Sequence, residues 1–83
     1  MAKLRRSQLV EAYQYSGDPE NPGWPKGWLG DRLVFLADGA IYDSRDRFSM
    51  EVVAGDWVID DPLDGLGVFS EAEMLQDYEI VEA

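Results

Sequence analysis

The sequence predicts a small α+β protein that is mostly β: a bent antiparallel sheet or partly open barrel of five to six strands, with one short C-terminal helix. Three observations predict this class. Short apolar runs alternate with turn signals, Gly55-Asp56-Trp57-Val58-Ile59 combines a turn glycine with aromatic and β-branched residues, and a Ser-x-x-Glu capping box begins at Ser70. The chain has 83 residues, which is the size of one domain, so we expect residues 1–83 to form a single domain.

The N-terminal half contains one strand, a long loop and a hairpin. Residues 1–7 are polar and basic, and we expect a flexible tail there. Apolar and polar side chains interleave over residues 8–15, which predicts a strand with one wetter face. Three of the four prolines fall in residues 16–30 and predict an ordered loop with at most one helical turn. Asp38-Gly39 is the strongest hairpin signal, so we expect the runs on either side of it, 32–37 and 40–43, to pair antiparallel.

The C-terminal half continues with strands and then a helix. Residues 47–53 alternate as a half-buried strand, and the following strand ends at Pro62, which cannot donate to a ladder. After a short strand at Val68-Phe69, the capping box predicts a helix over residues 70–76. Residues 77–82 predict a last edge strand. The core is expected from Val10, Ala12, Leu33, Phe35, Ile41, Phe48, Met50, Trp57, Ile59, Phe69, Met74, Leu75 and Ile80.

Composition excludes several function classes. The chain has no cysteine and no histidine, which removes disulfides, thiolate nucleophiles and the commonest neutral-pH base and metal ligand. No apolar run is long enough to span a membrane, and we expect a soluble cytoplasmic protein without a cofactor. The net charge of −10 argues against direct nucleic-acid binding and favours a partner with a basic surface. Ten acidic residues and no Lys or Arg lie between residues 49 and 83: Glu51, Asp56, Asp60, Asp61, Asp64, Glu71, Glu73, Asp77, Glu79 and Glu82.

Trp24 and Trp28 lie four residues apart in the proline-rich loop, with Pro25 placed to begin a helical turn. One interpretation is that both rings fold back as the lid of a small core. The other is an exposed aromatic pair that anchors a partner, because tryptophan is frequent among interface hot spots.

Two carboxylate patterns in the sequence are candidates for chemistry. Asp60, Asp64, Gly65 and Glu71 occupy positions 1, 5, 6 and 12 of an EF-hand loop, but Pro62 stands at position 3 and a strand precedes the loop. Asp60 and Asp61 are neighbours in a predicted strand, so they should point to opposite faces and not converge on one substrate atom. We expect no catalytic residue and no enzyme activity.

The chain resembles a group of small phage and prophage proteins of uncharacterised role. Their shared motifs are V-x-A-x-Q-aromatic-x-G, G-D-W-[IV]-I, and an aromatic followed by a short helix and Tyr-Glu. Here these correspond to residues 10–17, residues 55–59, and Phe69 followed by the predicted helix and Tyr78-Glu79. The chain departs from the group after the central strand, where Phe69-Ser70 replaces a usual Tyr-Pro-Cys, and in the proline-rich loop. The resemblance implies a phage origin and expression in the bacterial cytoplasm, and it supplies no catalytic residue.

The leading hypothesis is a phage-encoded, non-enzymatic binding protein that inhibits a host nucleic-acid-handling defence system, of the anti-CRISPR or anti-restriction type, by occupying a basic site. The expected partner-binding residues are Asp60, Asp61, Asp64, Glu71, Glu73, Trp24 and Trp28. A structural or accessory phage protein that self-associates through strand edges is the alternative, and a calcium-binding module is a third.

Overall fold

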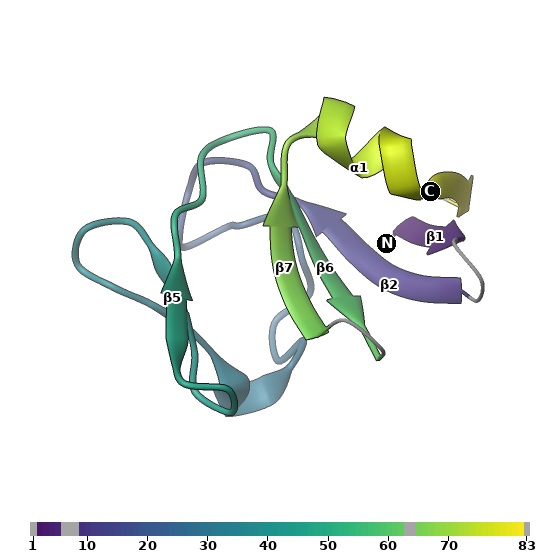
Figure 1. Cartoon of the computed structure of the whole chain (residues 1–83). Coiled ribbons are helices and arrows are strands. Elements are labelled where there is room, and N and C mark those ends of the chain that lie inside the picture. The colour runs from purple at the N-terminus through teal and green to yellow at the C-terminus, as the bar shows by residue number, and fades with distance from the viewer. Residues whose placement is uncertain (1, 6–8, 63–64, 83) are drawn as a thin grey trace.

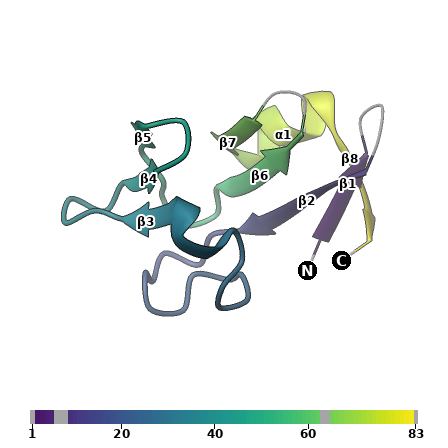
Figure 2. The ribbon, with the colours of Figure 1, turned by 90° about the horizontal axis from the view of Figure 1, so that it is seen from below.

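The protein is built from two antiparallel sheets and one α-helix. The computed structural model describes residues 2–5, 9–62 and 65–82. One sheet has five strands in the order β7-β6-β2-β1-β8, and the other has three in the order β3-β4-β5 (Figures 1 and 2). Neither closes into a barrel, and the predicted class, α+β and mostly β with a short C-terminal helix, is confirmed. The elements are β1 (Ala2–Arg5), β2 (Leu9–Gln14), the 3-10 turn η1 (Gly30–Arg32), β3 (Leu33–Phe35), β4 (Ile41–Asp43), β5 (Phe48–Met50), β6 (Trp57–Asp61), β7 (Gly65–Phe69), α1 (Glu71–Asp77) and β8 (Glu79–Glu82).

The five-stranded sheet is assembled around β2 and β6, which pair antiparallel with Ala12 opposite Ile59. Strand β7 extends β6 as a hairpin, and β8 lies at the other edge of the sheet, as predicted. The sheet holds one strand that the sequence did not predict. Residues 2–5 form β1, between β2 and β8, where a flexible tail was expected over residues 1–7. Polar composition misled the prediction, because a strand with a neighbour on each side gains its ladder hydrogen bonds whatever its side chains are.

The strands of the three-stranded sheet lie between β2 and β6 along the sequence, not in space. Its β3–β4 hairpin turns at Asp38-Gly39 as predicted, and Gly39 adopts a φ of 89°. The Asp38 carboxylate accepts a hydrogen bond from the backbone N–H of Ala40 at 3.0 Å, which fixes the turn. In Figure 2 this sheet lies beside the end of the five-stranded sheet where β2 meets the proline-rich loop.

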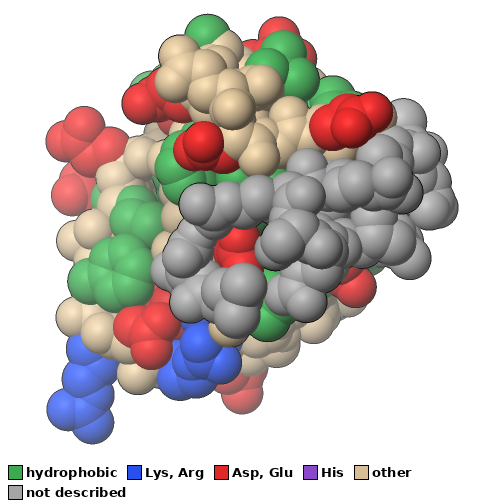
Figure 3. All heavy atoms as spheres, turned by 45° about the vertical axis from the view of Figure 1, so that its right-hand side comes forward, with side chains coloured by type: hydrophobic (Ala, Val, Ile, Leu, Met, Phe, Trp, Pro, Cys, Tyr) green, Lys and Arg blue, Asp and Glu red, His purple; other side chains and the backbone are tan. Residues whose placement is uncertain are grey.

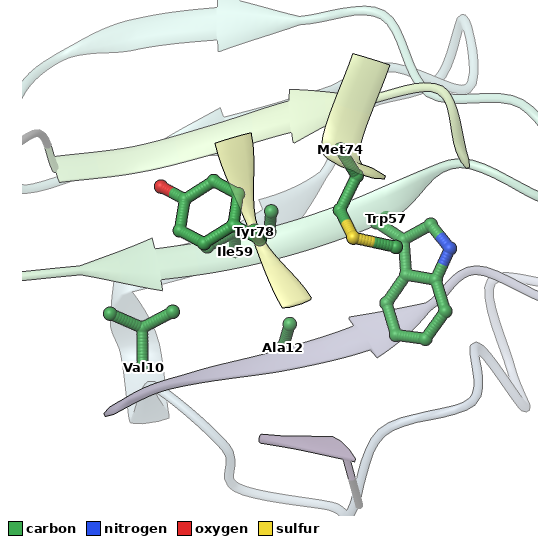
Figure 4. Packing of buried hydrophobic residues seen from close by; sticks show 6 residues of the cluster. All are labelled: Val10, Ala12, Trp57, Ile59, Met74 and Tyr78. Carbon is green, nitrogen blue, oxygen red and sulfur yellow. The ribbon is translucent and has the colours of Figure 1, made fainter. Parts of the chain in front are cut away.

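Side-chain alternation along β2 and β6 creates two apolar clusters, one on each face of the larger sheet. On the helix face, Met74 of α1 points toward the indole ring of Trp57 and covers the sheet (Figure 4). This cluster contains Val10, Ala12, Trp57, Ile59, Met74 and Tyr78, with Phe69 packed against it. On the loop face, Val58 packs with Tyr15, Ile41, Val52 and Leu66. Each face of β6 is therefore buried, so its predicted role as an interior strand holds.

The expected core list is wrong at three positions. Phe48, Leu75 and Ile80 are exposed, with 39%, 54% and 41% of their surfaces accessible. Phe48 lies on β5, an edge strand of the smaller sheet, and Leu75 follows the buried Met74 on a helix of only two turns that packs along one side. The remaining expected core residues are buried or half-buried.

Helix α1 begins at the predicted capping box. The Ser70 hydroxyl accepts from the backbone N–H of Glu73 at 3.2 Å, and the Glu73 carboxylate accepts from the backbone N–H of Ser70 at 3.1 Å. Both bonds satisfy donors that a helix start leaves unpaired. Glu73 is consequently both an exposed acid and a structural residue.

Candidate binding surfaces

The proline-rich loop between β2 and η1 is held in place by its own backbone. The Ser16 N–H donates to the Pro22 carbonyl at 2.8 Å, and the Trp28 N–H donates to the Pro25 carbonyl at 3.0 Å. Gly23 has a φ of 110°, and a Cβ there would collide with the carbonyl oxygen of Gln14. Only glycine permits this close approach of the loop to the end of β2.

The two tryptophans of this loop pack on aromatic residues of β2 and β3 and on Tyr15, which follows β2. Trp24 lies parallel to Phe35, with an interplanar angle of 2° and ring centroids 5.8 Å apart, and it also stacks on Tyr15. Trp28 meets Tyr13 edge to face at 4.6 Å. Both indoles are half-buried against the loop-face cluster. They therefore cover the core, as the first interpretation predicted, while part of each ring remains accessible.

The accessible parts of these rings face a pocket of about 690 Å³, which we call the tryptophan pocket. Its apolar wall consists of Trp24, Trp28, Leu33 and Phe35. The loop and the first residue of η1 supply the rest: Pro19, Glu20, Asn21, Pro22, Gly23, Pro25, Lys26, Gly27 and Gly30. A concave, aromatic-lined site with a few polar groups is the usual form of a ligand or peptide site.

Acidic side chains lie in the lining of the tryptophan pocket and in the segments next to it. Glu20 lines it and is exposed, and Asp18 and Asp31 are exposed in the adjoining segments. Glu11 projects from β2 and accepts a hydrogen bond from the Trp28 indole Nε1 at 3.1 Å. Burial, and secondarily the charge of Glu11, raises the pKa of the neighbouring Tyr13 phenol. Lys26 lies in the same wall as Glu20, so the lining carries one charge of each sign, and Glu11 is a further carboxylate beside it.

A second acidic surface, the acidic helix face, lies on the opposite side of the larger sheet. It consists of Glu71, Glu73 and Asp77 on α1 and Glu79 at the start of β8, all of them exposed. The last turn of α1 has no basic residue. In Figure 3, acidic side chains are spread over this view, including its upper end, and the basic side chains drawn in blue lie at its lower end.

The structure separates the residues that were expected to form one partner-binding site. Trp24 and Trp28 lie on the loop face, whereas Glu71 and Glu73 lie beside the helix face. Asp61 is 4% exposed, and its carboxylate accepts a hydrogen bond from the Tyr78 hydroxyl at 2.8 Å. It is thus a structural residue and no part of an exposed acidic surface. Asp64 lies outside the described residues.

Asp60 and Asp61 point to opposite faces, as their adjacency in a strand predicted. Asp60 faces η1 and lies 3.4 Å from the Arg32 guanidinium, while Asp61 faces Tyr78. The EF-hand spacing does not produce a site either. Asp61 pairs with Gly65 in the β6–β7 hairpin, so β7 runs away from Asp60. Glu71 comes after the far end of β7 and therefore does not lie beside Asp60. Within residues 2–5, 9–62 and 65–82, no cluster of three acidic side chains has metal-binding geometry.

Sequence reasoning missed a partly buried ion cluster formed by Arg32, Asp43, Asp46 and Asp60. The Arg32 guanidinium binds Asp43 in bidentate fashion, from Nε to Oδ1 and from Nη2 to Oδ2, both at 2.9 Å. Asp46 and Asp60 each lie 3.4 Å from the same guanidinium. Because Asp60 belongs to β6 and Asp43 to β4, the cluster joins the two sheets. The hairpin register around Asp38-Gly39 could have revealed it, since it brings residue 32 beside residues 43 and 44.

The ion cluster predicts acid-dependent stability. The hydrogen bonds from Arg32 hold the pKa of Asp43 below its usual range, against the opposing effect of burial. A carboxyl whose pKa is lower in the folded state contributes stability that is complete above the unfolded pKa, near 4, and is lost as the pH falls through the folded pKa. Thermal melts from about pH 5 downward should therefore show a smaller loss of melting temperature for Asp43→Asn than for the parent. Equal losses in both proteins would assign the acid sensitivity to other carboxylates.

Comparison with protein-family models, with curated proteins and with solved structures found no significant match. In the part of the chain that the structure describes, no helix has the length and apolar character needed to cross a bilayer. The class defined by fold and surfaces is a small, acidic, mostly β protein with an aromatic pocket on one face of its larger sheet and an acidic surface on the other.

Proposed function

We propose that this protein is a non-enzymatic binding protein that occupies a basic site on a partner protein. The observation that carries the proposal is the acidic helix face, where four acids are exposed in a segment, residues 49–83, that contains no Lys or Arg. The segment itself supplies no base to neutralise them, although the register of β1 and β8 sets Arg5 opposite Glu79. Glu71, Glu73 and Asp77 on α1 therefore carry most of the charge that is available to a partner and that orients the protein in its field.

The finer proposal concerns the partner. Sites that bind nucleic acid are rich in Lys and Arg, because they neutralise phosphates. An acidic protein surface complements such a site. Together with the resemblance to phage proteins, this favours a host nucleic-acid-handling defence protein, such as a CRISPR effector or a restriction enzyme, as the target in the bacterial cytoplasm.

Affinity capture from a bacterial host lysate, with identification by mass spectrometry, tests the proposal. The tagged protein should retain a basic nucleic-acid-binding protein at low salt and lose it as salt is raised, because exposed charges are screened. Glu71→Lys/Asp77→Lys should abolish capture, since two favourable charges become repulsive. Glu73 and Asp61 are left unchanged, because the first caps α1 and the second is buried.

The matched control reverses two exposed acids away from α1, Asp31→Lys/Glu51→Lys, with the same change in net charge. This variant should retain most of the capture. If both double variants lose the partner equally, overall charge and not the acidic helix face is responsible. Unchanged capture by Glu71→Lys/Asp77→Lys contradicts the proposal.

Self-association is the second candidate, and exposed apolar side chains on and beside the smaller sheet favour it. Val34, Phe48 and Val53 are 43%, 39% and 64% exposed, and β3 and β5 are both edge strands. Unpaired edges can template pairing with another copy. Sedimentation at micromolar concentration should then give a stable oligomer that Phe48→Lys dissociates, whereas a monomer excludes this candidate.

A further inference from the structure

We infer that the tryptophan pocket receives an arginine side chain from an extended basic segment of a partner protein. The inference rests on the proposed function in taking the partner to be basic. It adds a second contact surface, on the face of the larger sheet opposite α1, and names the chemistry recognised there.

The shape of the pocket suits a flat group. Its apolar wall offers accessible parts of Trp24, Trp28 and Phe35, and the tilt of 52° between the two indoles gives the pocket two differently oriented aromatic surfaces. A guanidinium is planar and weakly hydrated and stacks on aromatic faces, whereas an ammonium is compact and strongly hydrated. Arginine therefore fits this wall better than lysine.

The pocket offers carboxylates to a cation, although Lys26 in the same wall balances the charge of Glu20. Glu20 lies in the wall, and none of the ion pairs among the described residues involves its carboxylate. Glu11 is fixed beside the wall by the Trp28 indole, which donates to it at 3.1 Å. The neighbouring Arg32 does not offset these acids, because its guanidinium is bound by Asp43, Asp46 and Asp60.

The pocket is also preorganised. Gly23 fits tightly against Gln14, backbone hydrogen bonds close the loop, and Trp24 is held by Tyr15 and Phe35. A site whose rings are already ordered loses little conformational entropy on binding. Pro19, Pro22 and Pro25 restrict the same loop further.

The test is a titration with the peptide acetyl-Gly-Arg-Gly-amide, followed by the indole N–H signals of the intact ¹⁵N-labelled protein. The three tryptophans give one signal each, and each is assigned with its phenylalanine variant. The Trp24 and Trp28 signals should shift together. Trp57 lies on the helix face and serves as the internal reference.

Three comparisons decide the outcome. The peptide with citrulline in place of arginine keeps the planar shape without the charge, and it should bind about fivefold more weakly because the cation–π attraction is lost. Glu20→Gln should weaken arginine binding about threefold, as expected for one exposed ion pair. Glu51→Gln makes the same charge change away from the tryptophan pocket and should leave binding unchanged.

Equal binding of the citrulline and arginine peptides would overturn the inference, as would shifts confined to Trp57. Tighter binding of a neutral proline-rich peptide than of the arginine peptide would also overturn it and would identify a polyproline ligand. Because this titration contains no host protein, failure here combined with capture through the acidic helix face would remove only the arginine pocket. Success here combined with failed capture would remove only the proposed function.

Discussion

Asp43→Ala is expected to lower the free energy of unfolding by about 3 kcal/mol, because it leaves the Arg32 guanidinium largely buried without its bidentate partner. Arg32 has only 12% of its side chain exposed and Asp43 has none, so water cannot replace the lost interaction. The Asp43 carboxylate also accepts from the backbone N–H of Arg45 at 3.0 Å, so the turn after β4 weakens too. Chemical denaturation with a two-state fit measures the change.

Asp46→Ala is the matched control for this prediction. Asp46 approaches the same guanidinium at 3.4 Å, but its side chain is 43% exposed. An exposed ion pair contributes at most about 1 kcal/mol, so this variant should stay close to the parent. Similar losses for the two variants would show that burial is not what makes the Arg32–Asp43 pair important.

Met74→Ala is expected to cost about 3 kcal/mol, whereas Leu75→Ala, one residue further along α1, should cost less than about 1 kcal/mol. Met74 is fully buried in the helix-face cluster, and Leu75 is 54% exposed. Both changes put alanine into the same short helix, so differences in helix propensity are small. Denaturation midpoints measured under identical conditions give the comparison, and equal losses would contradict the placement of α1 on the sheet.

The elements that the sequence predicted best are those with local signals. Asp38-Gly39 fixes a hairpin, and Ser70 with Glu73 fixes the start of α1, because each signal acts within four residues. The five residues from Gly55 to Ile59 identified the interior strand β6, since both of its faces carry apolar side chains.

The features that the sequence predicted poorly depend on contacts between distant residues. Strand β1 has only four residues, and the alternation of Ala2 and Leu4 with Lys3 and Arg5 is too short to predict a strand by itself, so β1 is defined by its pairing with β2 and β8. Leu75 was expected in the core beside Met74, yet a two-turn helix buries only one side. Arg32 and Asp43 were taken as ordinary strand-end residues, and their pairing follows only from the hairpin register.

The candidate site was predicted in its residue types but not in its arrangement. The tryptophan pair was recognised, but the pocket beneath it required the loop to fold back over β2 and β3. The expected acidic surface lost Asp61 to the core and Asp60 to the ion cluster. What remains is the acidic helix face, which Asp77 and Glu79 extend beyond the residues first expected.

The placement of the two surfaces limits how a partner can bind. The tryptophan pocket and the acidic helix face lie on opposite faces of one sheet, so a single flat surface cannot cover both. A partner that uses both must wrap around an edge of the sheet or present a cleft. A cleft lined with Lys and Arg meets that requirement and is the form in which many proteins hold nucleic acid.

The most direct test of the proposed function is competition between this protein and nucleic acid for the captured partner. Fluorescence anisotropy of a labelled oligonucleotide bound to that partner should fall as the protein is added, and Glu71→Lys/Asp77→Lys should leave the anisotropy high. If partner, oligonucleotide and protein instead form a ternary complex with undiminished anisotropy, the protein does not occupy the basic site and the proposed function is wrong.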